Sequence, residues 1–171
     1  DGRARMIGVR DPEGGGLSMS PTGGARFERA SWLQRAGLRE PSPWPATAAD
    51  GTAIARCDNL GCVIGMNDRT IALMYRAEAA ADDCRSADVI VSLVPIRGAC
   101  PSPALIVDRF DLRRNGAHAI WIDRGIIRVR SVDAVRGNRP WVLRADPWHK
   151  SNNRPASKPR VRRRPLLRSD V

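Results

Sequence analysis

The sequence contains few aromatic residues, almost no histidine and no long apolar run. Of its 171 residues, eight are aromatic, five of these being Trp, and two are histidines, His118 and His149. A metal-dependent hydrolase centre needs several imidazoles and carboxylates that converge on the metal, so this composition excludes a histidine-rich metal centre. No apolar stretch reaches the roughly 18 residues that span a bilayer. Because the chain begins at Asp1, we expect it to be a piece from the C-terminal end of a longer protein.

Sequence motifs for nucleophilic catalysis and for phosphate binding are missing as well. There is no Gly-x-Ser-x-Gly motif and no cysteine–histidine pair at a recognisable spacing. The glycine-rich segment 11–16 lacks the Lys-Ser/Thr ending of a phosphate-binding loop. The apolar segments on either side of it, 5–9 and 17–19, predict a β-hairpin around this turn.

The net charge of +11 is concentrated at the C-terminal end. Residues 147–171 contain eight Lys or Arg side chains and one Asp, whereas residues 1–146 contain 21 cationic and 17 acidic side chains. The C-terminal segment is also rich in Pro, Asn and Ser and shows no apolar period. We therefore predict one domain over residues 1–146 and a disordered basic tail over residues 147–171.

Apolar periodicity predicts a mixed α/β fold. The continuous apolar run at 89–94 is typical of a strand buried on both faces, and Asp108 is a good N-cap for a following helix that Gly116 ends. The expected elements are, in chain order, a helix at 25–36, strands at 53–57, 62–66 and 70–74, a helix at 77–85, strands at 89–94 and 104–107, a helix at 108–114, and a hairpin of 117–122 with 126–132.

The four cysteines form an even set in a small domain, which favours two disulfides in an oxidising compartment. Of the three ways to pair them, we favour Cys57 with Cys62 and Cys84 with Cys100. Buried free thiols are one alternative. A zinc site is another, although the fifteen residues between Cys84 and Cys100 depart from the tight Cys-x2-4-Cys knuckles of such sites.

Three side chains are candidates for acid–base chemistry, and each also has a structural interpretation. Asp108 and Asp111 could share a helix face as a carboxylate pair, but N-cap and first-turn positions account for both. His118 has no visible partner in the sequence, so we expect it to be structural. Asp88 is interpreted as an ordinary acid flanking a helix. No metal ligand and no cofactor are predicted.

Basic residues are the candidates for direct binding. Arg128 and Arg130 alternate along one predicted strand and would form a shallow basic surface, without the interleaved aromatics that stack on bases. The tail could bind nucleic acid phosphates by counterion release, lie against anionic lipid headgroups, or have no function of its own. Its candidate residues are Lys158, Arg160, Arg162, Arg163, Arg164 and Arg168.

Four segments of the sequence, taken in order, resemble a known family. They are WL at 32–33, CDNLGCV at 57–63, DC at 83–84 leading to ADVIV at 87–91, and DLRRNGAHAI at 111–120 followed by RGNRPW at 136–141. In order and spacing, these segments resemble the C-terminal soluble region of the ComEC family of DNA-uptake competence proteins, as found in alphaproteobacteria. The resemblance covers residues 5–142.

The resemblance implies a domain of a polytopic bacterial inner-membrane protein that passes single-stranded DNA into the cytoplasm during natural transformation. It also implies a metallo-β-lactamase-like αββα sandwich, a fold that includes metal-dependent nucleases. The chain lacks the His-x-His-x-Asp-His cluster of that fold, and residues 95–100 stand where a His-His-Gly turn would lie.

From this departure we expect a truncated, degenerate version of the sandwich. It would be a non-catalytic, periplasmic domain that contacts DNA backbone, the transmembrane channel region of the parent protein or the membrane surface. The alternatives are a residual metal-dependent nuclease or hydrolase, which would use carboxylates and His118, and a purely structural domain.

Overall fold

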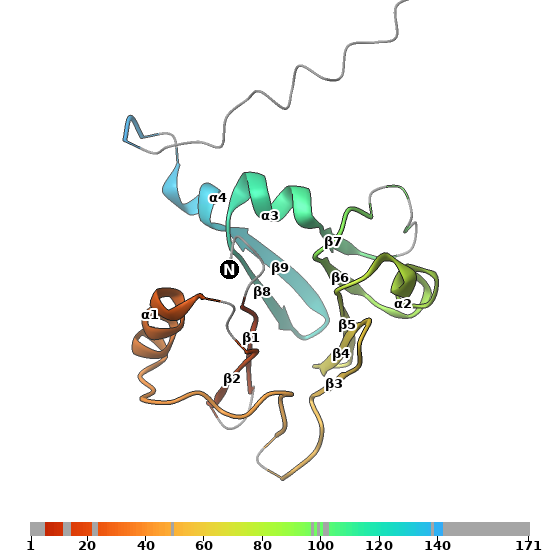
Figure 1. Ribbon diagram of the computed structural model, residues 1–171, viewed down its shortest axis with the longest axis horizontal. Coiled ribbons are helices and arrows are strands. Elements are labelled where there is room, and N and C mark those ends of the chain that lie inside the picture. Colours follow the sequence, from red (N-terminus) through yellow and green to blue (C-terminus); the bar gives the residue numbers. More distant parts are fainter. Residues whose placement is uncertain are drawn as a thin grey trace, which may run out of the picture.

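The computed structural model describes residues 6–11, 15–21, 24–48, 50–96, 98, 100, 103–137 and 139–141 (Figure 1). The strands are β1 Gly8–Arg10, β2 Leu17–Met19, β3 Ala55–Cys57, β4 Gly61–Met66, β5 Arg69–Met74, β6 Val89–Ser92, β7 Leu105–Val107, β8 His118–Asp123 and β9 Ile126–Ser131. The helices are α1 Arg26–Ala36, the short 3-10 helix η1 Ala77–Ala79, α2 Ala80–Ser86, α3 Arg109–Asn115 and α4 Val132–Arg136. The predicted tail, residues 147–171, lies outside the described residues.

The N-terminal hairpin and the first helix form as the sequence predicts. Strands β1 and β2 pair antiparallel around the glycine-rich segment. Helix α1 ends at Gly37, which adopts a left-handed conformation with φ 71° and donates its N–H to the carbonyl of Gln34. Glycine adopts this conformation without the steric cost that a Cβ would bring.

A mixed five-stranded sheet in the order β3-β4-β5-β6-β7 forms the centre of the molecule. The predicted meander β3-β4-β5 is antiparallel, and β6 and β7 extend it in parallel. The apolar run at 89–94 supplies β6, in which Val89 and Ile90 have no exposed surface. The strand is shorter than predicted, because the hydroxyl of Ser92 bonds the backbone of Val94 and turns the chain.

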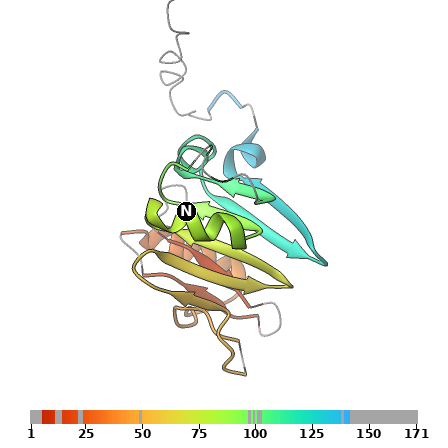
Figure 2. The same cartoon turned by 90° about the vertical axis from the view of Figure 1, so that its right-hand side faces the viewer.

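Three clusters of buried side chains join four successive layers, a helix, a β-hairpin, the sheet and a second helix (Figure 1). The first cluster packs α1 on β1–β2, the second packs β1 on β3 and β4, and the third packs α2 on β5 and β6. Pairs that represent them are Leu33 with Met19, Val9 with Ile64, and Cys84 with Ile90. Figure 2 shows α2 lying across the outer face of the sheet.

Strands β8 and β9 form a separate two-stranded ribbon beside this stack. Their two-residue turn has positive φ at both Arg124 and Gly125, the geometry that matches the twist of a tight hairpin. The ribbon is fixed to the β4–β5 turn, because Asn67 Nδ2 donates to the Ile122 carbonyl at 2.7 Å and Arg69 Nη2 donates to the Gly125 carbonyl at 3.1 Å.

Helix α4 was not predicted from the sequence. The strand expected to run to residue 132 ends at Ser131, whose hydroxyl accepts the N–H of Ala134 and caps the helix. A Ser at an N-cap accounts for this change of structure. The helix is five residues long, too short to show an apolar period.

Asp88 connects three strands, and its interpretation as an ordinary acid flanking a helix is wrong. Its Oδ1 accepts from Arg69 Nη1 at 2.7 Å, and its Oδ2 accepts the N–H of Thr70 at 2.8 Å. Its carbonyl accepts the N–H of Ala104, just before β7. The hydrogen bond from Thr70, followed by that from Arg69, lowers the pKa of Asp88 from its ordinary value of 3.8.

We expect Asp88→Asn to lower the free energy of unfolding, and to do so most above about pH 5. A carboxylate whose pKa is lowered by folding stabilises the folded state fully when the pH is above its ordinary pKa in the unfolded chain. This contribution is lost as the pH falls through the lowered pKa of the folded state. Urea unfolding at pH 7 and at about pH 2 measures the effect. The difference between the variant and the original chain should shrink at acid pH. An equal difference at both pH values would contradict the assignment.

The matched control for Asp88→Asn is Asp82→Asn. Asp82 pairs with Arg85 at 2.7 Å, but its side chain is 87% exposed. Exposed ion pairs contribute little, so this variant should unfold within about 0.5 kcal/mol of the original chain.

Gly61, in the sequence CDNLGCV, lies where two backbones approach closely. A Cβ at this position would collide with the carbonyl oxygen of Leu73 on β5, whereas a Cβ at Gly65 of the same strand would meet open space. We expect Gly61→Ala to destabilise the fold by about 1–3 kcal/mol or more. Gly65→Ala should be neutral or slightly stabilising. Thermal and urea unfolding of both variants measure this difference, and equal stabilities would contradict it.

Candidate functional site

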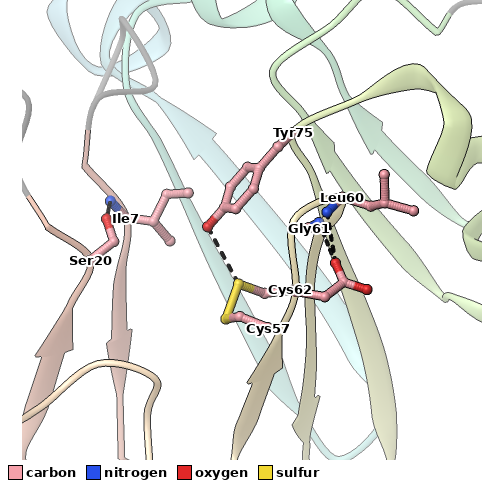
Figure 3. The surroundings of a disulfide bond; sticks show 8 residues. Ile7, Ser20, Cys57, Leu60, Gly61, Cys62 and Tyr75 are labelled. Carbon is pink, nitrogen blue, oxygen red and sulfur yellow. Dashed lines mark hydrogen bonds between the residues drawn. A yellow bond between two sulfur atoms is a disulfide. The ribbon is translucent and has the colours of Figure 1, made fainter.

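The structure contains both disulfides in the favoured pairing. Cys57 and Cys62 lie directly opposite each other on β3 and β4, with their Cα atoms 4.0 Å apart. The turn between them is held by Asp58, whose Oδ1 accepts the N–H groups of Leu60 and Gly61 at 2.8 and 2.9 Å. Tyr75, which follows β5, places its hydroxyl 3.3 Å from Cys62 Sγ (Figure 3), and burial raises the pKa of this phenol.

The second disulfide ties α2 to the segment after β6. Cys84 and Cys100 are 4% and 8% exposed and belong to the core cluster between the sheet and α2. Because all four sulfurs are in disulfides, none of them is a thiolate that could ligate zinc. Within the described part of the chain, no three His, Cys, Asp or Glu side chains lie together as a metal site would require.

The two candidate carboxylates form a capping box at the start of α3. Asp108 is fully buried, and its Oδ1 accepts the N–H groups of Phe110 and Asp111. Asp111 Oδ2 accepts the N–H of Asp108 in return, and its Oδ1 pairs with Arg114 at 3.1 Å. These bonds satisfy the orphan N–H groups of the helix. The interpretation of Asp108 as the N-cap and of Asp111 as a first-turn residue therefore holds.

His118 stands at the first position of β8, and its Nδ1 lies 2.9 Å from the Gly116 carbonyl. Its strand partner is Ser131 at the end of β9. The imidazole is half-buried and is engaged by the backbone two residues away, which is a local structural role.

Arg128 and Arg130 lie on one face of the β8–β9 hairpin, as the predicted alternation requires. The strand register puts Trp121 directly opposite Arg128, and Ala119 opposite Arg130. Directly opposed residues of an antiparallel pair project to the same side. The earlier expectation of a basic surface without aromatics is therefore wrong, because Trp121 lies among the arginines. The sequence could have predicted this pair, because a two-residue turn at 124–125 places residue 121 opposite residue 128.

We call this side the outer face of the hairpin. Its six residues are all exposed, namely Ala119, Trp121, Asp123, Ile126, Arg128 and Arg130. On the opposite side, Ile122 is buried and Ile120 and Ile127 are half-buried. Within the described part of the chain, neither Arg128 nor Arg130 forms an ion pair. The two guanidinium groups are therefore available to a ligand.

Two surface depressions lie elsewhere. One of about 390 Å³ borders the Cys57–Cys62 disulfide and contains Asp58, Asp82 and Asp83. Burial, and then the neighbouring carboxylates of Asp58 and Asp82, raise the pKa of Asp83, so this surface disfavours anions.

The other depression, of about 620 Å³, runs along α1 and carries three arginines, Arg26, Arg29 and Arg39. It contains no nucleophile or acid–base pair among its described residues. The six basic candidates of the tail, Lys158 to Arg168, lie outside the described residues.

Comparison of the chain with models of protein families, with curated proteins and with solved structures gives no match. Among the residues described, none of the helices has the length and apolar character needed to cross a bilayer.

Both disulfides should contribute to stability, the second more than the first. Loop-closure entropy gives about 2 kcal/mol for Cys57–Cys62 and about 3 kcal/mol for Cys84–Cys100, whose sequence separations are 5 and 16. Urea unfolding of Cys57→Ser/Cys62→Ser and of Cys84→Ser/Cys100→Ser measures these losses. Mass mapping of the unreduced chain checks the pairing. A mixed pairing, or a larger loss for the first pair, would contradict the prediction.

Proposed function

We propose that this chain is a non-catalytic accessory domain of a membrane channel for DNA uptake, of the ComEC type. It would face the periplasm and contact the DNA backbone. One contrast carries the proposal. The candidate acid–base groups are bonded to local backbone, whereas the arginines on the outer face of the hairpin are exposed and without ion pairs among the described residues.

The fold that we propose is a truncated metallo-β-lactamase-like sandwich. The succession of α1, the β1–β2 hairpin, the central sheet and α2 has the layer order of an αββα arrangement (Figure 1). In this succession the second β layer is the short hairpin β1–β2 rather than a continuous sheet, as a truncated sandwich would have.

The segments that carry the resemblance support a domain of defined structure. The segment 57–63 builds the disulfide turn and the close approach at Gly61. The segment 87–91 supplies Asp88 and the buried strand β6. The segment 111–120 comes after the N-cap Asp108 and contains most of α3 and the first half of β8. These three segments thus have structural tasks, which is what a domain that has lost a metal centre would retain.

The two disulfides support the periplasmic location. Disulfides persist in oxidising compartments such as the bacterial periplasm and are rare in the cytosol. A periplasmic surface of an uptake channel is also where incoming DNA would first meet the protein.

The first test is a fluorescence-anisotropy titration of labelled single-stranded DNA with the full chain, at 50 mM and at 150 mM salt. We expect binding that weakens with salt, because arginine–phosphate contacts release counterions. The DNA should stay intact when Mn²⁺ is added. Metal-dependent cleavage would contradict the non-catalytic assignment, and absence of binding at both salt concentrations would leave a purely structural domain.

A second titration assigns the contact within the chain. In this variant all eight basic residues of the tail are replaced by Ser, namely Lys150, Arg154, Lys158, Arg160, Arg162, Arg163, Arg164 and Arg168. Retained binding would locate the contact on the domain, and lost binding would locate it on the tail. Vesicles containing anionic lipid serve as the comparison, since tighter binding to them than to DNA would favour the membrane surface as partner.

A further inference from the structure

The β8–β9 hairpin presents one face that no other described element covers. Helix α1 packs on the neighbouring hairpin β1–β2, and α4 follows the end of β9. All six residues of the outer face are exposed, including the tip residue Ile126 at 64%. The face is two strands wide, and in Figure 2 the hairpin extends to one side of the molecule.

Trp121 is the unusual member of this face. Tryptophan is on average highly buried in proteins, yet Trp121 is 45% exposed and stands at the middle of the hairpin. Its direct neighbour across the strands is Arg128, and its diagonal neighbour is Arg130. Because Ala119 opposite Arg130 is small, the indole has room on that side. An exposed ring flanked by cations offers a base a π-face and its phosphate a charge.

The cations have a fixed spacing. Residues two apart on a strand are about 6.8 Å apart, so Arg128 and Arg130 form a short row along β9, opposite Trp121 and Ala119 of β8. Neither guanidinium is neutralised by a carboxylate among the described residues. Asp123 is the acid on the same face, and it lies at the tip end, opposite Ile126. Positive charge therefore predominates on the half of the face that carries the indole.

We infer that the outer face of the hairpin is a binding platform for single-stranded nucleic acid, in which Trp121 stacks on a base and Arg128 and Arg130 bind flanking phosphates. The inference rests on the proposed function. It adds which surface of the domain would bind the nucleic acid, and that this nucleic acid would be single-stranded. A duplex keeps its bases stacked inside, so an exposed indole fits a single strand better.

The test compares variants of the full chain by anisotropy with a labelled oligothymidine. Trp121→Ala should weaken binding by about 5- to 100-fold and leave the salt slope unchanged, whereas Trp121→Phe should retain most of the affinity. Arg128→Ser/Arg130→Ser should weaken binding and flatten the slope of log K against log salt by about 1.4, since each phosphate contact on a single strand contributes about 0.7.

Helix α1 offers matched controls. Phe27 is an aromatic side chain that is 81% exposed, and Arg26 and Arg35 are exposed arginines on the same helix. Phe27→Ala and Arg26→Ser/Arg35→Ser should bind oligothymidine as the original chain does. Thermal unfolding of every variant checks that the exposed substitutions leave the fold intact.

The outcomes separate this inference from the proposed function. If the original chain binds and the hairpin variants bind equally well, the platform is wrong and the DNA-contact function stands. If the original chain does not bind, both are wrong. Tighter binding to a duplex of the same length would also overturn the platform. The same holds if Trp121→Ala loses binding to anionic vesicles but keeps its binding to DNA.

Discussion

The pairing of Asp88 with Arg69 fixes how the two halves of the molecule meet. Asp88 directly precedes β6, the strand that pairs in parallel with the last strand of the antiparallel meander. Its carboxylate accepts hydrogen bonds from the side chain of Arg69 and from the backbone N–H of Thr70. The other end of the same guanidinium reaches the carbonyl of Gly125 in the β8–β9 turn. One arginine therefore links the central sheet to the hairpin. The direction in which the outer face points depends on this link.

Covalent links supply the rigidity that a small core cannot. Large aromatic side chains are scarce in this chain, and the three core clusters consist mainly of Ala, Met and Ile. Small domains bury a low fraction of their surface, so constraints on the unfolded chain carry more weight. Cys57–Cys62 closes the meander where two backbones already approach closely, and Cys84–Cys100 anchors α2 on the sheet.

Local signals in the sequence predicted local structure well. The Asp108 cap, the glycine that ends α1, the buried strand β6 and both disulfides follow from residue type and short spacing. What failed depended on which residues pair across a sheet, or on an element with too few residues to show a period. Asp88 has its role only because β5 and β6 become parallel neighbours, and Trp121 meets Arg128 only through the hairpin register. Helix α4 has too few residues to show a period. The order β3-β4-β5-β6-β7 likewise could not be read from any one segment.

The distribution of polar groups explains why a binding role fits this domain better than a chemical one. Catalysis needs groups that are positioned by the fold and still available to a substrate. Here Asp108, Asp111 and His118 are positioned but bonded to the backbone around them. Arg128 and Arg130 are exposed. The hairpin beneath them is held at its turn by the bond from Arg69 to the Gly125 carbonyl, and at its other end by the bond from the Val132 N–H to the Ala117 carbonyl. This exposed, cationic surface is the one that the proposed contact with nucleic acid phosphates would use.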